Sequence, residues 1–434
     1  MASYDEDSTT MAVEALRSAF AARPDFQPQQ LLLSSTSPAY EDKTNAAVVH
    51  AALGLDRDVF AADFCGAVRS GVGALRLALG SSQRSSVVLS DVRGGLPGSD
   101  DEALGGDGAS AVLVGRDPDE LLATLVSDAS VTAEFLERWR TPGQYGSRTW
   151  EDRFGEHAYL PMAMEAFTTA LETASMTETD VDHLAVVGLQ ERALRLAVGR
   201  LGVKPDAVVD THRDAIGNSG PAMIGVALAA ALRRAKAGET IVLLSLADGA
   251  DALVFRATDA VSTASVPDVG ALASAAANHV AYPRYLTWRG QLLREPPRRP
   301  DMIPPSAPPA LRSAPWKFGF TGSQCAQCGT THLPPQQVCI KCQSRDDMQA
   351  RPMSEIAATL TTFTVDHLAL SLDPPSVVGV VDFDGGGRYR CELTDCEPDH
   401  IAVGDRVEMT FRRVFTAAGI HNYVWKARPI REKI

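Results

Sequence analysis

The sequence has few aromatic residues, no excess of positive charge and no long apolar run, and each absence excludes a class of protein. Phe, Trp and Tyr make up 6% of the 434 residues, so we expect cores built from Ala, Gly and aliphatic side chains. The net charge of −13 argues against a general nucleic-acid binder and against binding to an anionic membrane surface. No apolar run is long enough to span a bilayer and no secretory signal opens the sequence, so we expect a cytoplasmic protein that contacts neither membrane nor nucleic acid.

Cysteine is also scarce, and its distribution favours metal binding over disulfides. Four of the seven cysteines form two CxxC pairs, Cys325 with Cys328 and Cys339 with Cys342, separated by ten residues. Two such pairs place four thiolates around one tetrahedral zinc ion. A redox dithiol or an iron–sulfur site is the alternative. We predict a closed structural zinc site with no open coordination position.

Predicted strands and helices alternate through the first part of the chain. The alternation indicates a layered α/β architecture. Glycine-rich turns at residues 105–115 and 215–225 lead into a predicted strand and a predicted helix, and the order of the segments indicates two similar βαβ-type halves, one around Cys65 and one around Asn218. The clearest segments are strands at residues 31–35, 86–90, 183–187 and 240–245 and helices at residues 11–20, 44–53, 191–201 and 221–232.

One cysteine lies between a predicted strand and a predicted helix. An apolar run ends at Phe64, Cys65 follows, and small residues from Gly66 open a helix that continues to Leu79. The free N–H groups at a helix N-terminus stabilise a thiolate, so we expect a lowered pKa for Cys65 and a role as a nucleophile. The alternative is a free cysteine buried in a core, which is common.

The composition changes after about residue 258. Eight prolines between residues 293 and 315 predict an extended, semi-rigid connector, and a short helix is expected just before it at residues 282–293. The zinc motif follows. Five short β-type runs then suggest a small barrel of the OB type: residues 357–364, 376–382, 388–393, 406–412 and 421–427.

Residues 1–257 resemble the thiolase superfamily, and within it the archaeal type of 3-hydroxy-3-methylglutaryl-CoA synthase, with ketoacyl-ACP synthase III as a cousin. The motifs that carry the resemblance are Ser-Thr-Ser-Pro-Ala-Tyr-Glu-Asp-Lys at 35–43, Phe-Cys-Gly-Ala at 64–67, Gly-Asp-Gly-Ala at 106–109 and Ile-Gly-Asn-Ser-Gly at 216–220. The resemblance implies a layered α/β/α/β/α domain and a coenzyme A thioester as substrate. It also implies that Cys65 accepts the acyl group and that Asn218 steers the thioester carbonyl.

The chain departs from that family at two positions. Thr36 stands where the family has its acid/base glutamate, and Gly188 stands where it has a histidine. The family's first strand has no counterpart either. An asparagine beside a glycine also suits a turn, so Asn218 has a structural alternative. His212 is the first candidate to replace the missing base, although a surface or capping role is the stronger expectation for it.

Residues from about 282 onward resemble the DUF35 family, which has a helix, a rubredoxin-like zinc ribbon and an OB fold. We therefore divide the chain into a thiolase-like domain at 1–257, a helix and Pro-rich connector at 258–316, a zinc ribbon at 317–350 and an OB-fold domain at 351–434. DUF35 proteins associate with thiolase-type enzymes. The resemblance thus implies a thiolase-type partner and a homodimer or a larger hetero-oligomer.

Two functions agree with these features. The first is an acyl-CoA-handling subunit of an acyltransferase complex that forms or cleaves a C–C bond. The second is a non-catalytic scaffold that docks a thiolase or aldolase and helps to bind coenzyme A through its DUF35 part. A third, nucleic-acid binding by the ribbon and OB fold, is disfavoured because residues 351–434 carry no dense basic stripe with interleaved aromatics.

Overall fold

The computed structural model describes residues 1–434 except 276–278, 296–297, 299, 301 and 431–434. Its first part contains two four-stranded sheets. In the first sheet, β2, β1 and β3 run parallel and β4 is antiparallel to β3, in the order β2-β1-β3-β4. The strands are β1 (Gln30–Ser35), β2 (Phe60–Cys65), β3 (Ser85–Val92) and β4 (Asp107–Val114).

The second sheet repeats this mixed pattern in the order β5-β10-β9-β8. Strands β8 and β9 are parallel, and β10 is antiparallel to both β9 and β5. The chain reaches a further strand-like position at Val208, which forms a single parallel bridge with Leu184 of β8. The strands are β5 (Ala123–Val131), β8 (His183–Gly188), β9 (Thr240–Leu246) and β10 (Ala250–Ala257).

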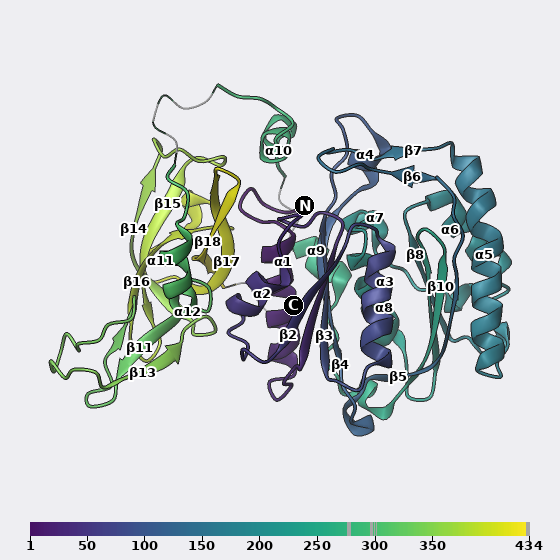
Figure 1. The fold of residues 1–434 in the computed structure, drawn as a ribbon, viewed down its shortest axis with the longest axis horizontal. Coiled ribbons are helices and arrows are strands. Elements are labelled where there is room, and N and C mark those ends of the chain that lie inside the picture. The colour runs from purple at the N-terminus through teal and green to yellow at the C-terminus, as the bar shows by residue number, and fades with distance from the viewer. Residues whose placement is uncertain (276–278, 296–297, 299, 301, 431–434) are drawn as a thin grey trace.

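Helices separate and cover the two sheets, giving the predicted α/β/α/β/α layers (Figure 1). Successive residues of β1 alternate between cores, because strand side chains point to opposite faces. Leu31 and Leu33 pack with α1 and α2, whereas Leu32 packs with α3 and α8. Helices α5 and α6 cover the outer face of the second sheet. The bounds are α1 (Ser8–Ala22), α2 (Ala46–Ala52), α3 (Arg69–Gly80), α5 (Asp152–Thr173), α6 (Glu191–Arg200) and α8 (Ala222–Arg234).

Short elements connect the layers, and α4, β6, β7 and α10 lie near the upper edge of the molecule in Figure 1. The helix predicted at 282–293 is confirmed as α10 but ends at Trp288. Strand β5 and the hairpin of β6 and β7 have no counterpart among the predicted segments. The short elements are α4 (Asp100–Leu104), β6 (Arg138–Trp139), β7 (Arg148–Thr149), α7 (Arg213–Ile216), α9 (Val269–Ala275) and α10 (Tyr282–Trp288).

The Pro-rich connector is not extended throughout, which corrects the prediction. Its second part forms α11 (Ala307–Arg312) and α12 (Ala314–Lys317). Both helices have proline in their first turn, where no backbone N–H is needed and the fixed φ of proline suits a helix. Clustered prolines therefore initiate two short helices here instead of keeping the chain extended.

The C-terminal part consists of a three-stranded ribbon and a closed five-stranded barrel, as predicted. The ribbon strands pair antiparallel in the order β12-β11-β13, and the barrel closes in the order β14-β15-β16-β18-β17. The strands are β11 (Thr321–Cys325), β12 (Thr331–His332), β13 (Met348–Pro352), β14 (Ala358–Asp366), β15 (Ser376–Phe383), β16 (Arg388–Leu393), β17 (Arg406–Ala417) and β18 (Ile420–Pro429).

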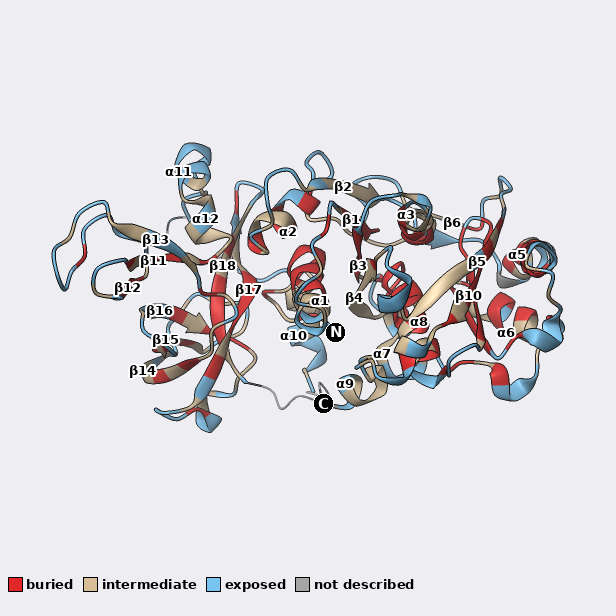
Figure 2. Cartoon of the chain, turned by 90° about the horizontal axis from the view of Figure 1, so that it is seen from below, coloured by how far each residue is buried: buried red, intermediate tan, exposed pale blue. Residues whose placement is uncertain are grey.

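The barrel packs directly against the first sheet's outer helices. Figure 2 shows α1 between the first sheet and strands β17 and β18. One apolar cluster joins Leu16 of α1 to Phe411 and Trp425 of the barrel. Charged groups are buried beside it: Lys426, which is 1% exposed, lies 3.0 Å from the fully buried carboxylate of Asp5. The two parts therefore share a core.

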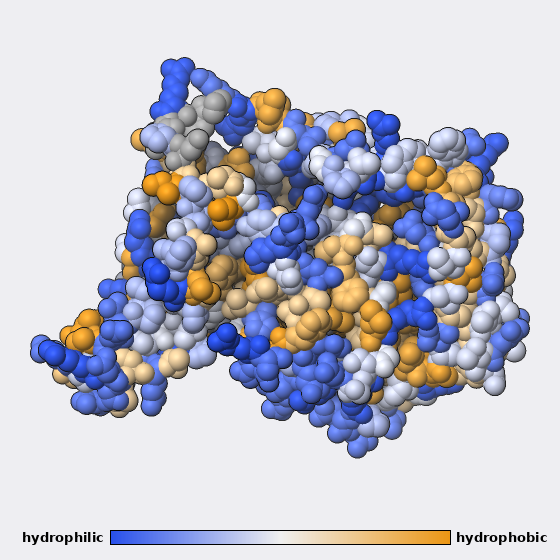
Figure 3. Space-filling view, viewed as in Figure 1, coloured by the Kyte–Doolittle hydropathy of each residue, from blue (hydrophilic) through white to orange (hydrophobic). Residues whose placement is uncertain are grey.

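The apolar residues mostly lie in the three cores formed by these layers. Across the face drawn in Figure 3, the remaining apolar residues are interspersed with polar ones. Among the residues that the structure describes, no helix combines the length and the apolar character needed to cross a bilayer.

Candidate functional site

Cys65 opens onto a hollow of about 960 Å³ at the ends of β1 and β2. Both main parts of the chain supply its wall. Cys65 ends β2, Thr36 and Arg93 directly follow β1 and β3, and Arg413 and His421 come from the barrel. The segment from β6 to β7, the loop between β9 and β10 and the end of helix α10 also line it. This volume is in the range of ligand-binding clefts.

The surroundings of Cys65 disfavour its thiolate. The residue ends β2, opposite Ser35 in the parallel register with β1, and α3 begins only at Arg69, without a side-chain cap. Burial, followed by the negative charges of Asp63 and Asp91, raises the pKa of the Cys65 thiol to about 11. The expectation of a lowered pKa at a helix N-terminus is therefore wrong, because three residues separate the thiol from the helix.

Thr36 belongs to a buried polar cluster centred on Asp91, at the end of β3. The Thr36 hydroxyl donates to Asp91 Oδ2 at 2.5 Å, and the Thr36 backbone N–H donates to Asp91 Oδ1 at 3.0 Å. Ser35 and Ser37 also donate to Asp91, which is fully buried. Arg93 Nη1 donates to the Thr36 hydroxyl oxygen at 2.8 Å. Thr36 is thus held rigidly and carries no titratable group.

Arg140 reaches this cluster from the segment between β6 and β7. Its Nη2 donates to the carbonyl oxygen of Thr36, and its Nη1 donates to that of Tyr145 at 3.4 Å. Burial, together with the positive charges of Arg138 and Arg140, lowers the pKa of Arg93, although Asp91 opposes the shift. No local pattern marks Arg93 or Arg140, because each is far from Thr36 in the sequence and contacts it only in the folded chain.

Asn218 lies 5% exposed in the turn before α8. Its side-chain amide donates to the carbonyl oxygen of Gly188 at 2.7 Å, and its side-chain oxygen accepts from the backbone N–H of Gly220 at 2.9 Å. It lines a second hollow, of about 330 Å³, that also includes Gly188. Cys65 lines the first hollow and Asn218 the second. Each polar atom of the Asn218 side chain therefore has a backbone partner.

Gly188 leaves no room for a side chain. A Cβ atom there would lie 2.5 Å from the carbonyl oxygen of Leu246 on the paired strand β9. His212, the first candidate to replace a base at this point, is not among the residues that line the Cys65 hollow. It has a positive φ of 56° just before α7, and its backbone N–H donates to Asp210. These features fit a structural role for His212.

Asp248 is a titratable group in the Cys65 hollow that the sequence reasoning missed. It follows β9 with a positive φ of 49°, and its backbone N–H donates to the hydroxyl of Tyr159 at 3.1 Å. Burial raises the pKa of its carboxyl above the usual range, despite the positive charge of Arg69. A carboxyl with a raised pKa can give and take protons nearer to neutral pH than an ordinary aspartate.

His421 is placed at the boundary between the barrel and the first sheet. Its Nε2 lies 3.1 Å from the carbonyl oxygen of Ala39, and its Nδ1 lies 2.7 Å from the hydroxyl oxygen of Thr416. Its ring is 4.8 Å from that of Tyr40. Burial lowers the pKa of His421, so the neutral ring holds the loop after β1 against the barrel.

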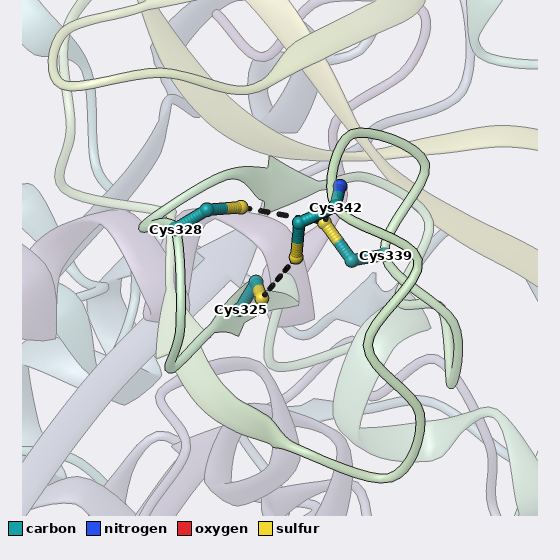
Figure 4. A group of neighbouring side chains, drawn as sticks. All are labelled: Cys325, Cys328, Cys339 and Cys342. Atoms are coloured by element: carbon teal, nitrogen blue, oxygen red, sulfur yellow. Dashed lines mark hydrogen bonds between the residues drawn. The ribbon is translucent and has the colours of Figure 1, made fainter.

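The four cysteines of the paired motifs come together in the ribbon (Figure 4). Their sulfur atoms all lie within 4.8 Å of one another, and none is in a disulfide. Hydrogen bonding to Thr330 lowers the pKa of Cys328 to about 6, which favours a thiolate. Four sulfur donors with no other ligand group fit a closed structural zinc site, as predicted. No ribbon residue lines the Cys65 hollow. The ligands are Cys325, Cys328, Cys339 and Cys342.

Three family models match separate segments. They are the C-terminal domain of 3-oxoacyl-[acyl-carrier-protein] synthase III at residues 171–256, the ChsH2 rubredoxin-like zinc ribbon at 319–348 and the ChsH2 C-terminal OB fold at 350–412. The ribbon and barrel thus match models of two adjoining domains, in the same order along the chain.

Related proteins match both the layered α/β part of the chain and the part that holds the ribbon and barrel. The chain is 31% identical over 270 residues to the hydroxymethylglutaryl-CoA synthase of Methanopyrus kandleri, covering 59% of this chain and 76% of that protein. It is 30% identical over 125 residues to a DUF35 domain-containing scaffold protein of Methanothermobacter thermautotrophicus, covering 27% of this chain and 92% of that protein. A solved structure of MvaS in complex with 3-hydroxy-3-methylglutaryl coenzyme A has a TM-score of 0.57 at 21% identity, over 70% of this chain and 84% of that one. This likeness shows that the α/β part of the chain has the same fold as that structure.

Proposed function

The chain belongs to the hydroxymethylglutaryl-CoA synthase family and continues into a zinc ribbon and OB fold of the DUF35 type. From this we propose that it handles acyl-CoA thioesters as a subunit of an acyltransferase complex that forms or cleaves C–C bonds. Cys65 is the proposed acyl acceptor and a thiolase-type protein the proposed partner. The observation that carries the proposal is the position of Cys65, at the end of β2 in the wall of the hollow.

The first step is transfer of the acyl group to Cys65. The thiol loses its proton, the sulfur bonds to the thioester carbonyl carbon, and the bond to the coenzyme A sulfur breaks, so that coenzyme A leaves as its thiol. Because the pKa of Cys65 is raised to about 11, few molecules hold the thiolate at neutral pH. We therefore expect slow acylation in the isolated chain.

The condensation or cleavage step needs an acid/base. Thr36 and Gly188 cannot supply one, and loss of such a group costs on the order of 10²–10⁴ in rate. Asp248 is the candidate within this chain, because it lines the hollow and burial raises the pKa of its carboxyl. We propose that a thiolase-type partner supplies any further acid/base group that the reaction needs. The hydrogen bonds of Asn218 support a positioning role for that residue, and steering of a carbonyl by it stays a prediction.

The second candidate is a scaffold without its own chemistry. It is favoured by the barrel, which packs on α1 and contributes Arg413 and His421 to the hollow wall. In that case the DUF35 part helps to hold coenzyme A while a docked thiolase or aldolase performs the reaction.

Mass spectrometry of the full-length protein, digested after labelling, distinguishes the acyl-accepting subunit from the scaffold. After incubation with acetyl-CoA, an acyl-accepting subunit gains an acetyl group on the Cys65 peptide, and the Cys65→Ala variant does not. A scaffold gains no acetyl group on Cys65 but still binds coenzyme A in a calorimetric titration. Acetylation of Cys391 or Cys396 instead of Cys65 would contradict the first proposal, since those sulfurs are buried or half-buried.

Assembly is proposed at the free edge of the first sheet. Strand β2 has no second neighbour among the described strands, and Phe60 at its start is 59% exposed. An open strand edge offers unpaired backbone groups to another chain. We expect a homodimer or a larger hetero-oligomer. Sedimentation that finds a stable monomer at micromolar concentration would contradict this.

A further inference from the structure

We propose that helix α10 is a strap across one wall of the Cys65 hollow, and that the ion pair of Arg289 with Asp107 is the latch that holds this strap closed. The inference rests on the proposed function, because it concerns how a thioester enters that same hollow. Helix α10 lies between the barrel and α4 (Figure 1). Trp288, its last residue, and Arg289, which follows it, both line the hollow. A movement of α10 therefore opens or closes this wall.

Helix α10 is held in place without an apolar core. None of its seven residues is buried, and none belongs to the three apolar cores that the structure describes. Its side chains make hydrogen bonds, an ion pair and a ring contact with other elements at or near the surface, where water competes for the same groups. An element with few buried apolar contacts is among the first to open. These contacts are Tyr282 with Glu102 at 3.1 Å, Arg284 with Asp373 at 3.2 Å, Trp288 with the carbonyl oxygen of Leu372 at 3.2 Å and Trp288 with the ring of Tyr4 at 5.9 Å.

The contact of Arg289 is different, because it is buried. The Arg289 side chain is 9% exposed and forms an ion pair with the carboxylate of Asp107, which is 2% exposed. Asp107 begins β4, and two backbone groups fix its carboxylate. Its Oδ1 accepts from the N–H of Arg93 at 2.9 Å, and its Oδ2 accepts from the N–H of Ala2 at 2.7 Å. The end of α10 is thus anchored to a rigidly held carboxylate at the edge of the first sheet.

Loss of the Asp107 charge should release the helix. Arg289 has no other ion pair among the described residues, and its Nε has no hydrogen-bond partner among them. A buried charge without a counter-charge is strongly destabilising, and the guanidinium regains its solvation only by moving into water. Because Arg289 directly follows α10, this movement draws the helix away from the hollow.

Asp107 itself is not among the residues that line the hollow, so it acts on the hollow only through Arg289. It is therefore a positioning residue. Its place at the start of β4 connects the order of the first sheet to the closure of the hollow.

Hydrogen exchange of the full-length protein tests the latch. We expect Asp107→Asn to speed exchange of the α10 amides at least about tenfold, while the amides of the barrel keep the rate of the parent protein. Arg289→Gln removes the same ion pair from the helix side and leaves Asp107 its two backbone donors, so it should speed exchange at α10 even if Asp107→Asn disturbs the sheet. The matched control is Arg284→Gln, which removes the exposed ion pair of the same helix and should change this exchange about threefold at most.

Unchanged exchange at α10 in both Asp107→Asn and Arg289→Gln overturns the latch, and so does an equally large increase in Arg284→Gln. A second measurement adds saturating acetyl-CoA to the parent protein. A thioester in the hollow should slow exchange at α10, and binding that leaves this exchange unchanged overturns the strap. If calorimetry finds that neither acetyl-CoA nor coenzyme A binds, the proposed function fails, whereas the exchange of the free variants still decides the latch.

Discussion

At Cys65 the fold combines an accessible position with surroundings that oppose ionisation. The residue is exposed and opens onto the hollow, yet partial burial of the sulfur and the carboxylates of Asp63 and Asp91 raise its pKa to about 11. Asp63 is fixed in place, because it accepts hydrogen bonds from the backbone N–H groups of Asn45 and Ala46 at the start of α2. The raised pKa therefore follows from the packing of the first sheet.

The alkylation rate of Cys65 should therefore keep rising with pH to about pH 11, in step with the thiolate fraction. Iodoacetamide labelling of the Cys65 peptide, followed by mass spectrometry from pH 7 to 11, measures it. Cys391 and Cys396 are internal controls and should react more slowly, since burial raises the pKa of each to about 12. A rate that levels off below pH 9 would show a stabilised thiolate.

A second residue-scale prediction concerns Gly188. Gly188→Ala should destabilise the protein by about 1–3 kcal/mol, because the added Cβ meets the Leu246 carbonyl oxygen at 2.5 Å. Chemical unfolding measures the change. The control is Gly199→Ala in α6, where a Cβ meets nothing within 4 Å and alanine favours the helix, so stability should stay or rise. Equal stability of Gly188→Ala and the parent would mean that the backbone of β9 at Leu246 shifts to accommodate the added Cβ at little cost.

The sequence located Cys65 but not the groups around it. A β-type run followed by small residues marks a strand and a turn, so the nucleophile candidate could be found locally. Asp91 is 55 residues from Thr36 and Arg140 is 104 residues away. Their contact depends on parallel pairing of β1 with β3 and on where the hairpin of β6 and β7 folds back. No local pattern contains that information.

At the scale of elements, the sequence predicted the strands best where apolar residues run continuously. Strands β3 and β9 are fully or almost fully buried, so their apolar runs stand out. The start of α3 was set too early, because Gly66 to Val68 are small or apolar but form the turn; Gly66 has a φ of 110°. Helices α11 and α12 have no local signal of their own, because clustered prolines are also typical of an extended chain.

The zinc ribbon of β11, β12 and β13 should depend on its metal ion for its structure. Cys325→Ser should release zinc and remove hydrogen-exchange protection from β11 to β13, because four thiolates hold this small unit together. The barrel should keep its protection, since its own core includes Leu360, Phe411 and Trp425. Metal analysis and hydrogen exchange measure both effects.

Cys396→Ser is the matched control for the ribbon, because that cysteine is half-buried outside the metal cluster. It should keep its zinc. Loss of protection in the barrel or the two sheets of Cys325→Ser would contradict the prediction and show that the ribbon supports them.

At the scale of the whole molecule, the barrel and the first sheet are joined by charge as well as by apolar packing. Arg17 of α1 donates to the carbonyl oxygen of Met409 and forms an ion pair with Glu355. Arg412 and Lys426, each 1% exposed, lie beside the acidic residues that precede α1. Buried ion pairs cost desolvation and stabilise only while both partners are charged. The contact between the two parts should therefore depend on pH.

Glu14 is the carboxylate whose titration tests this. It lies 2.7 Å from Arg17 and 2.8 Å from Arg428 of β18. Burial alone would raise the pKa of Glu14, but the two guanidinium groups outweigh it and lower the pKa below the usual 4.5. A carboxylate with a lowered folded-state pKa adds stability above its unfolded-state value, and this stability is lost as pH falls through the folded-state value. The free energy of unfolding should thus fall as pH decreases below about 4.5.

Glu14→Gln should reduce this fall and should lower stability at pH 7 by about 1–3 kcal/mol, since Arg17 and Arg428 lose their shared partner but keep Glu355 and Glu408. Urea unfolding at pH 7, 5, 4 and 3 measures both. The control is Glu172→Gln on α5, an exposed carboxylate for which the structure shows no ion pair, and its pH dependence should match that of the parent. A parent and a Glu14→Gln variant with the same pH dependence would mean that Glu14 keeps its unfolded-state pKa and that other carboxylates account for the acid sensitivity of the interface.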